Sequence, residues 1–157
     1  MADQRPVASA GAERRPRRPR AASGVVAGER IRPVQSAQVA APTVPYSQAL
    51  VVEAGRLLFI AGQGPVDAAG NLVGAGDVEA QVRQVFANVR ALLEAAGGRL
   101  DHLVELTIYL RDMRHRPAVT RVREELLRPP YPTATMVEIS RLAFDDWLVE
   151  ISAIAAL

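Results

Sequence analysis

YPTATMVEISRL at residues 131–142 and WLVEISAIA at residues 147–155 are the two stretches that decide the fold. In both, apolar residues alternate with polar or small ones. A period of two is typical of β-strands, because successive side chains point to opposite faces of a sheet. The Asp145-Asp146 pair between the stretches predicts a turn. The chain is therefore predicted to close with two strands.

Two short apolar runs lie further upstream, at residues 48–53 and 56–61. Ala54-Gly55 separates them, which favours two antiparallel strands joined by a tight turn. Residues 67–76, with Gly70-Asn71 and Gly74, predict a loop.

Two amphipathic helices are predicted, one before and one after a strand in the sequence. Asp77 is the predicted N-cap of the first, and Gly97-Gly98 ends it. Its apolar residues recur at helical spacing: Val78, Val82, Val85, Phe86, Val89, Leu92 and Leu93. The second begins near Pro117 and ends at Pro129-Pro130. Its predicted inward residues are Val119, Val122 and Leu126.

The intervening strand is predicted at residues 102–110. Its predicted buried face is Val104, Leu106, Ile108 and Leu110, and its other face is Glu105, Thr107 and Tyr109. The predicted order is β-β-α-β-α-β-β, an α+β domain with two helices on one face of a mixed, mainly antiparallel sheet. The uncovered sheet face predicts an oligomer, because an exposed half-apolar sheet tends to associate.

Residues 1–40 differ in composition from the rest of the chain. Arginine, proline and alanine dominate this part, and it lacks apolar periodicity, so we expect a disordered tail followed by one domain at residues 41–157. The first 32 residues carry a net charge of +5, whereas the remaining 125 carry −3. Residues 14–20 could bind an acidic surface, but no aromatic residues lie among the arginines, and nucleic-acid binding is not expected.

The composition excludes several chemistries. The chain has no cysteine and no lysine, so thiolate and Schiff-base catalysis are excluded. His102 and His115 are too few for a histidine-based metal site, and we expect no metal and no cofactor. Residues 62–64, Gly-Gln-Gly, lack the context of a phosphate loop and predict a turn. No stretch is apolar enough for a secretory signal or a membrane span, so we expect a cytoplasmic protein without membrane contact.

PYSQAL, FIAGQ, the helix VEAQVRQVFANVRALLEAAG and the two closing strands resemble the RidA/YjgF family of enamine and imine deaminases. The resemblance covers about residues 41–155. It implies a chorismate-mutase-like, YjgF-like fold and a homotrimer with a barrel-like centre. It also implies that small-molecule ligands bind in clefts between subunits.

The resemblance implies roles for two residues. Glu150 matches the family's glutamate that positions or activates the hydrolytic water, and a partly buried carboxylate there would serve as a general base. Tyr46, within PYSQ, matches the tyrosine that lines the cleft, where it would donate a hydrogen bond or stack on a planar ligand. An ordinary strand glutamate and a core or interface tyrosine are the alternatives.

Four predicted substrate-binding positions depart from the family's deaminases. Ala134 stands where an arginine holds the substrate carboxylate, and Ala61, Thr120 and Met136 replace serine, asparagine and cysteine. We therefore expect a less polar pocket and inefficient hydrolysis of 2-iminopropanoate. Trp147 is expected to anchor the last hairpin or to line the cleft.

Three arginines are candidates to replace the missing one. Arg141 is seven residues from Ala134, and this odd separation predicts the opposite sheet face. Arg111 and Arg114 remain candidates.

Two functions from different classes follow. The first is a divergent family enzyme that uses Glu150 in acid–base chemistry on an enamine, imine or tautomerisable molecule of a specialised pathway. The second is a non-catalytic trimeric module that binds a small molecule or stabilises a partner. A ribonuclease is a third alternative, which the acidic domain disfavours.

Overall fold

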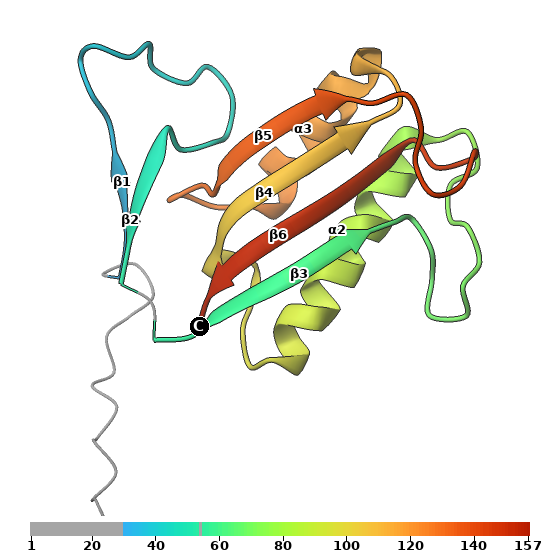
Figure 1. Cartoon of the computed structure of the whole chain (residues 1–157), viewed down its shortest axis with the longest axis horizontal. Helices are drawn as coiled ribbons and strands as arrows, with labels where there is room; N and C mark the ends of the chain where they lie inside the picture. The colour runs from blue at the N-terminus through green and yellow to red at the C-terminus, as the bar shows by residue number, and fades with distance from the viewer. Residues whose placement is uncertain (1–29, 54) are drawn as a thin grey trace, which may run out of the picture.

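The computed structural model describes residues 30–53 and 55–157. A four-stranded sheet forms its centre, with strand order β3-β6-β4-β5 (Figure 1). The strands are β3 (Leu57–Gln63), β4 (Leu103–Leu110), β5 (Thr133–Glu138) and β6 (Val149–Ala156). β6 pairs antiparallel with β3 and with β4, whereas β4 and β5 are parallel. The predicted α+β fold with a mixed, mainly antiparallel sheet is confirmed.

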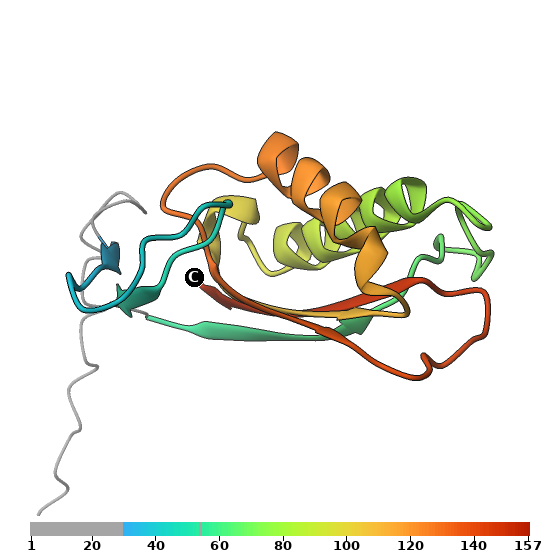
Figure 2. The same cartoon turned by 90° about the horizontal axis from the view of Figure 1, so that it is seen from above.

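Both helices cover the same face of this sheet (Figure 2). They are α2 (Val78–Ala95) and α3 (Arg116–Leu126). Asp77 caps α2 as predicted, because its carboxylate accepts hydrogen bonds from the backbone N–H groups of Glu79 and Ala80. Two short 3-10 helices, Leu100–His102 and Met113–His115, precede β4 and α3.

The core lies between the helices and the sheet. It consists of the apolar stripe of α2 and alternate residues of β4 and β6, including Val82, Phe86, Leu93, Leu106, Ile108, Ile151 and Ala153. One face of each central strand is therefore buried, and the other face carries Tyr109, Glu150 and Ser152. We call this second side of the sheet the open face, because no helix covers it.

The N-terminal strands form a separate two-stranded sheet. β1 (Ile31–Val34) pairs antiparallel with β2 (Ala49–Val52). The expectation of disorder is wrong for β1, whose Ile31 is buried. Residues 1–29 of the predicted tail lie outside the described residues.

Three predicted strand pairings or faces are wrong. β2 and β3 do not pair with each other, because β2 pairs with β1 and β3 with the long apolar β6. The closing strands form no hairpin, since β4 lies between β5 and β6. Val104 does not continue the buried face of β4, because a register shift between Leu103 and Glu105 buries Leu103 instead.

Candidate functional site

Glu150 lies on the open face, half-buried in the middle of the sheet. Tyr109 of β4 is its direct neighbour in the antiparallel register. A cavity of about 420 Å³ opens over both residues, and we call it the Glu150 cavity. It is lined by Gly62, Tyr109, Ile139, Arg141, Leu142, Ala143, Glu150 and Ser152. A carboxylate, a phenol and a hydroxyl therefore meet in one hollow, as acid–base chemistry requires.

A bulge in β3 lies beside the Glu150 side chain. The register between β3 and β6 shifts between Ile60 and Gln63, so Ala61 and Gly62 lie at an irregularity beside Glu150. A Cβ on Gly62 would overlap the Oε1 atom of Glu150. Ala61 is exposed next to this glycine, although its side chain does not line the cavity. The close approach of β3 to the carboxylate therefore requires glycine at position 62.

The other predicted site residues gather on the helix-covered side of the sheet, at the β5 edge. Met136 pairs in register with the buried Ile108, and Ala134 pairs with the buried Leu106. Tyr46 and Thr120 join them around a cavity of about 390 Å³, which we call the Tyr46 cavity. It is lined by Val44, Tyr46, Met113, Arg116, Thr120, Arg123, Ala134 and Met136.

Three hydrogen bonds hold the segment of Tyr46 against the rest of the protein. Ser47 donates a hydrogen bond from its hydroxyl to the carbonyl oxygen of Tyr131 (2.5 Å), and its N–H donates to that of Pro132 (3.2 Å). Arg123 of α3 donates from Nη2 to the carbonyl oxygen of Pro45 (2.6 Å). Tyr46 is thus placed by its two sequence neighbours.

Arg116 and Arg123 were missed by the sequence interpretation. Both line the Tyr46 cavity, so two positive charges stand beside the apolar replacements at Ala134 and Met136. The missed signal is position: Arg123 follows Val119 by one helical turn and therefore lies on the inward side of α3, where an arginine is unusual.

The three arginines considered as replacements lie elsewhere. Arg141 lines the Glu150 cavity, on the face opposite Ala134, as the odd spacing predicts. Arg111 donates to the carbonyl oxygen of Asp145, and Arg114 pairs with Asp112. None of them lines the cavity that contains Ala134.

Trp147 is separate from both cavities. Its ring packs against Phe144 with centroids 5.0 Å apart, and a Cβ on Gly64 would overlap it. It lines a smaller cavity of about 150 Å³ with Val66 and Leu72. Within one chain, Trp147 therefore packs among the loops beside the sheet, and it lines neither the Glu150 cavity nor the Tyr46 cavity.

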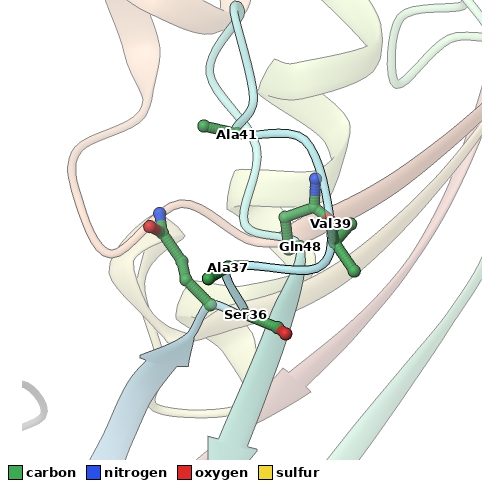
Figure 3. A pocket seen from close by; sticks show the side chains of 6 residues that line it. Ser36, Ala37, Val39, Ala41 and Gln48 are labelled. Carbon is green, nitrogen blue, oxygen red and sulfur yellow. The ribbon is translucent and has the colours of Figure 1, made fainter.

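A further cavity of about 270 Å³ lies in the loop between β1 and β2 (Figure 3). Ser36, Val39 and Gln48 are among its lining residues, and Gln48 donates a hydrogen bond to the carbonyl oxygen of Ala40 (2.5 Å). None of its lining side chains is acidic, basic or histidine. We therefore assign no acid–base chemistry to it.

Residues 30–53 and 55–157 contain no group of three or more His, Asp or Glu side chains that could hold a metal ion. No helix in this part of the chain is long and apolar enough to cross a membrane.

Burial lowers the pKa of His102, whose Nδ1 accepts a hydrogen bond from the N–H of Arg99 (3.3 Å).

Five of the predicted site residues thus lie on opposite faces of one sheet, whereas Ala61 and Trp147 line neither of the two cavities. Glu150 lies on the open face, whereas Tyr46, Thr120, Ala134 and Met136 lie on the helix-covered face. Because the sheet separates them, one chain does not bring Glu150 and Tyr46 to the same ligand.

Known proteins are similar to this chain in sequence and in fold. Residues 36–157 match the family model described as endoribonuclease L-PSP. A RutC family protein of Pyrococcus horikoshii is 44% identical over 114 residues, which are 73% of this chain and 88% of that protein. A 2-iminobutanoate/2-iminopropanoate deaminase of Dermatophagoides farinae is 29% identical over 116 residues, 74% of this chain and 88% of that protein.

Among solved structures, a member of the conserved Rid protein family from Yersinia pestis aligns with a TM-score of 0.75 and 30% identity. The alignment covers 82% of this chain and 99% of that one. The chain therefore belongs to the RidA/YjgF family, which includes imine deaminases.

Proposed function

We propose that this protein is an acid–base enzyme that acts on an enamine, an imine or a related tautomerisable molecule of a specialised pathway, with Glu150 as the acid–base residue. The observation that carries the proposal is the half-buried Glu150 carboxylate at the floor of an open cavity. The deaminase among the relatives supports the choice of substrate class.

The proposed hydrolysis balances with water as the only co-reactant. The Glu150 carboxylate takes a proton from water, and the water oxygen attacks the imine carbon. The proton passes to the nitrogen, which gives a carbinolamine. Transfer of the carbinolamine hydroxyl proton to the nitrogen then breaks the C–N bond and releases ammonia and a carbonyl compound. Tyr109, the register neighbour of Glu150, offers a hydroxyl that can orient the water.

We propose further that the complete site forms between copies in a homotrimer. Glu150 of one copy would face the Tyr46 cavity of the next, where Tyr46 and Thr120 supply hydroxyl groups. Exposed apolar side chains on the open face favour such association, because Phe59 is 71% exposed and Leu57 is 52% exposed.

The smallest 2-imino acids are not the expected substrates. Ala134 places no cation on β5, and losing one partner of a buried, hydrogen-bonded charge pair costs about 2–5 kcal/mol. That cost corresponds to roughly 30-fold to several thousand-fold in binding. We therefore expect slow turnover of 2-iminopropanoate.

The test is ammonia release from freshly generated 2-iminopropanoate and from larger imines with an apolar body. We expect release from a larger imine that Glu150→Gln abolishes, with slow release from 2-iminopropanoate. Asp145→Ala is the control, because its exposed side chain lies in the loop before β6. Equal rates with and without Glu150 would overturn the proposal, and silence on every imine would favour a non-catalytic binding module.

A further inference from the structure

Arg123 is a buried cation with few partners. It is 3% exposed, and its one hydrogen bond within the described part of the chain runs from Nη2 to the carbonyl oxygen of Pro45 (2.6 Å). Its Nε atom is buried without a hydrogen-bond partner there. An arginine offers five N–H donors and stays protonated in proteins, although burial lowers its pKa. The site therefore retains unused donors and a positive charge.

Two exposed arginines near Arg123 have carboxylate partners, whereas Arg123 has none among the described residues. Arg121 of the same helix pairs with Glu79 (2.7 Å), and Arg83 of α2 pairs with Glu125 (2.7 Å). The residues that line the Tyr46 cavity include no Asp or Glu. A buried cation without a counter-ion is costly, so a ligand that supplies the negative charge would be stabilising.

Arg116 adds a second positive charge to the same cavity. Arg116, Thr120 and Arg123 follow a spacing of four and three residues, so they lie along one side of α3. The apolar lining groups Val44, Ala134 and Met136 come from other parts of the chain than α3. The cavity thus has a cationic, hydrogen-bonding wall and an apolar wall.

We propose that the Tyr46 cavity binds the carboxylate group of a small molecule with an apolar body, through Arg123 at its buried end and Arg116 on its exposed rim. Planar guanidinium groups match carboxylates with paired hydrogen bonds. The cavity volume of about 390 Å³ lies in the usual range for small-molecule sites. Both cations lie on α3 and not on β5, so they would hold a carboxylate at a different place in the cavity from a cation at position 134.

This inference rests on the proposed function only in identifying the bound acid with the substrate. Combined, they describe an imine or enamine with a carboxylate at one end and an apolar body larger than that of 2-iminopropanoate. The binding of an anion can be measured without any turnover.

The experiment is calorimetric titration of the full chain with phenylacetate and with phenylacetamide, which have nearly the same shape but differ in charge. We expect phenylacetate to bind more tightly than the amide. Arg116→Ala and Arg123→Gln should each weaken phenylacetate by about 10-fold to 100-fold, the range for a hydrogen bond to a charged group. Neither should change the affinity for phenylacetamide by more than about 3-fold.

Arg121→Ala is the matched control, because it removes an arginine of the same helix that points to Glu79. It should leave both affinities unchanged. Arg116→Ala keeps the inference falsifiable if Arg123→Gln loosens the segment of Tyr46, since the side chain of Arg116 is exposed.

Equal binding of the two probes, absence of binding by either, or an unchanged phenylacetate affinity in folded Arg116→Ala would overturn the inference. Glu150-dependent ammonia release alongside such a result would leave the proposed function intact. Charge-selective binding without any release would support the anion site and contradict the enzyme.

Discussion

Gly62 lies directly against the carboxylate of Glu150, the proposed acid–base residue. A side chain on Gly62 would overlap Oε1 of Glu150, and the flexible carboxylate can move away more easily than the backbone of β3. The bulge that contains Gly62 therefore determines where the carboxylate lies, and it provides a way to move that carboxylate without removing it.

Gly62→Ala should displace the Glu150 carboxylate and lower turnover at least 100-fold, because a misplaced catalytic group loses about that factor. The free energy of unfolding should change by less than about 1 kcal/mol, since the glutamate can rotate into the open cavity. Steady-state ammonia release and urea unfolding measure the two effects. Unchanged turnover in a folded Gly62→Ala protein would show that the position of Glu150 is unimportant.

Asp112 provides a prediction on acid stability. The side-chain hydrogen bond from Arg114 lowers the pKa of Asp112 from 3.8 to about 2. Because the folded pKa lies below the unfolded one, the charged carboxylate stabilises the fold above about pH 4, and this contribution disappears as the pH falls toward 2.

The urea midpoint of Asp112→Asn should therefore lie below that of the unaltered protein at pH 7. The gap should close as the pH is lowered from about 4 toward 2, because the unaltered carboxylate then becomes protonated. A gap that stays constant over this range would mean that the charge of Asp112 contributes nothing.

Some of the important side chains are recognisable in the sequence, and others are not. Asp77 as a helix cap follows from a local rule, and the structure confirms it. Glu150 and Tyr46 were singled out by resemblance, since nothing in their local sequence distinguishes them from ordinary residues. Arg123 was missed although it follows Val119 by one helical turn, and its burial depends on the segment of Pro45, 78 residues away.

Among the elements, α2 is joined to two loops by a single buried side chain. Gln81 is 0% exposed and donates from Nε2 to the carbonyl oxygens of Gly74 (3.0 Å) and Asp146 (2.8 Å). Its Oε1 accepts from the N–H of Leu148 (2.7 Å). These bonds position the chain just before β6, the strand that carries Glu150.

Gln81→Leu should lower the free energy of unfolding by about 3 kcal/mol, because it leaves buried backbone groups without partners at about 1–3 kcal/mol each. Chemical denaturation measures the loss. Gln38→Leu, at an exposed position, should stay within about 0.5 kcal/mol and serves as the control. Equal stabilities of the two variants would contradict this role of Gln81.

The existence of helices and strands could be predicted, whereas their partners could not. Periodicity located α2, α3, β4, β5 and β6, because it reflects which side of an element is buried. Strand pairing depends on strands that are distant in the sequence. Although β2 and β3 are adjacent in the sequence, β2 pairs with β1 and β3 pairs with β6. The shift at Leu103 in β4 also escaped prediction, since a bulge leaves no periodic signal.

One face of the four-stranded sheet is covered by helices, and the other carries exposed apolar residues. Phe59 is the most exposed of these on β3, and its register partner on β6 is Ile154. If the open face is the interface of a trimer, a charge there should prevent assembly.

Phe59→Asp should convert a trimer into monomers in light scattering coupled to size-exclusion chromatography, with α2, α3 and the core intact by circular dichroism. Phe144→Asp is the control, because Phe144 is also exposed but lies in the loop before β6. A monomeric mass for the unaltered protein would contradict both the trimer and the shared site.

The most direct measurement is ammonia release by mixed oligomers of two inactive variants. Glu150→Gln lacks the acid–base residue, and Thr120→Trp fills the Tyr46 cavity. If Glu150 of one copy serves the Tyr46 cavity of the next, joint refolding should restore about a quarter of the sites by random assembly. Mixed oligomers that remain as inactive as the separate variants would contradict a reaction centre shared between copies.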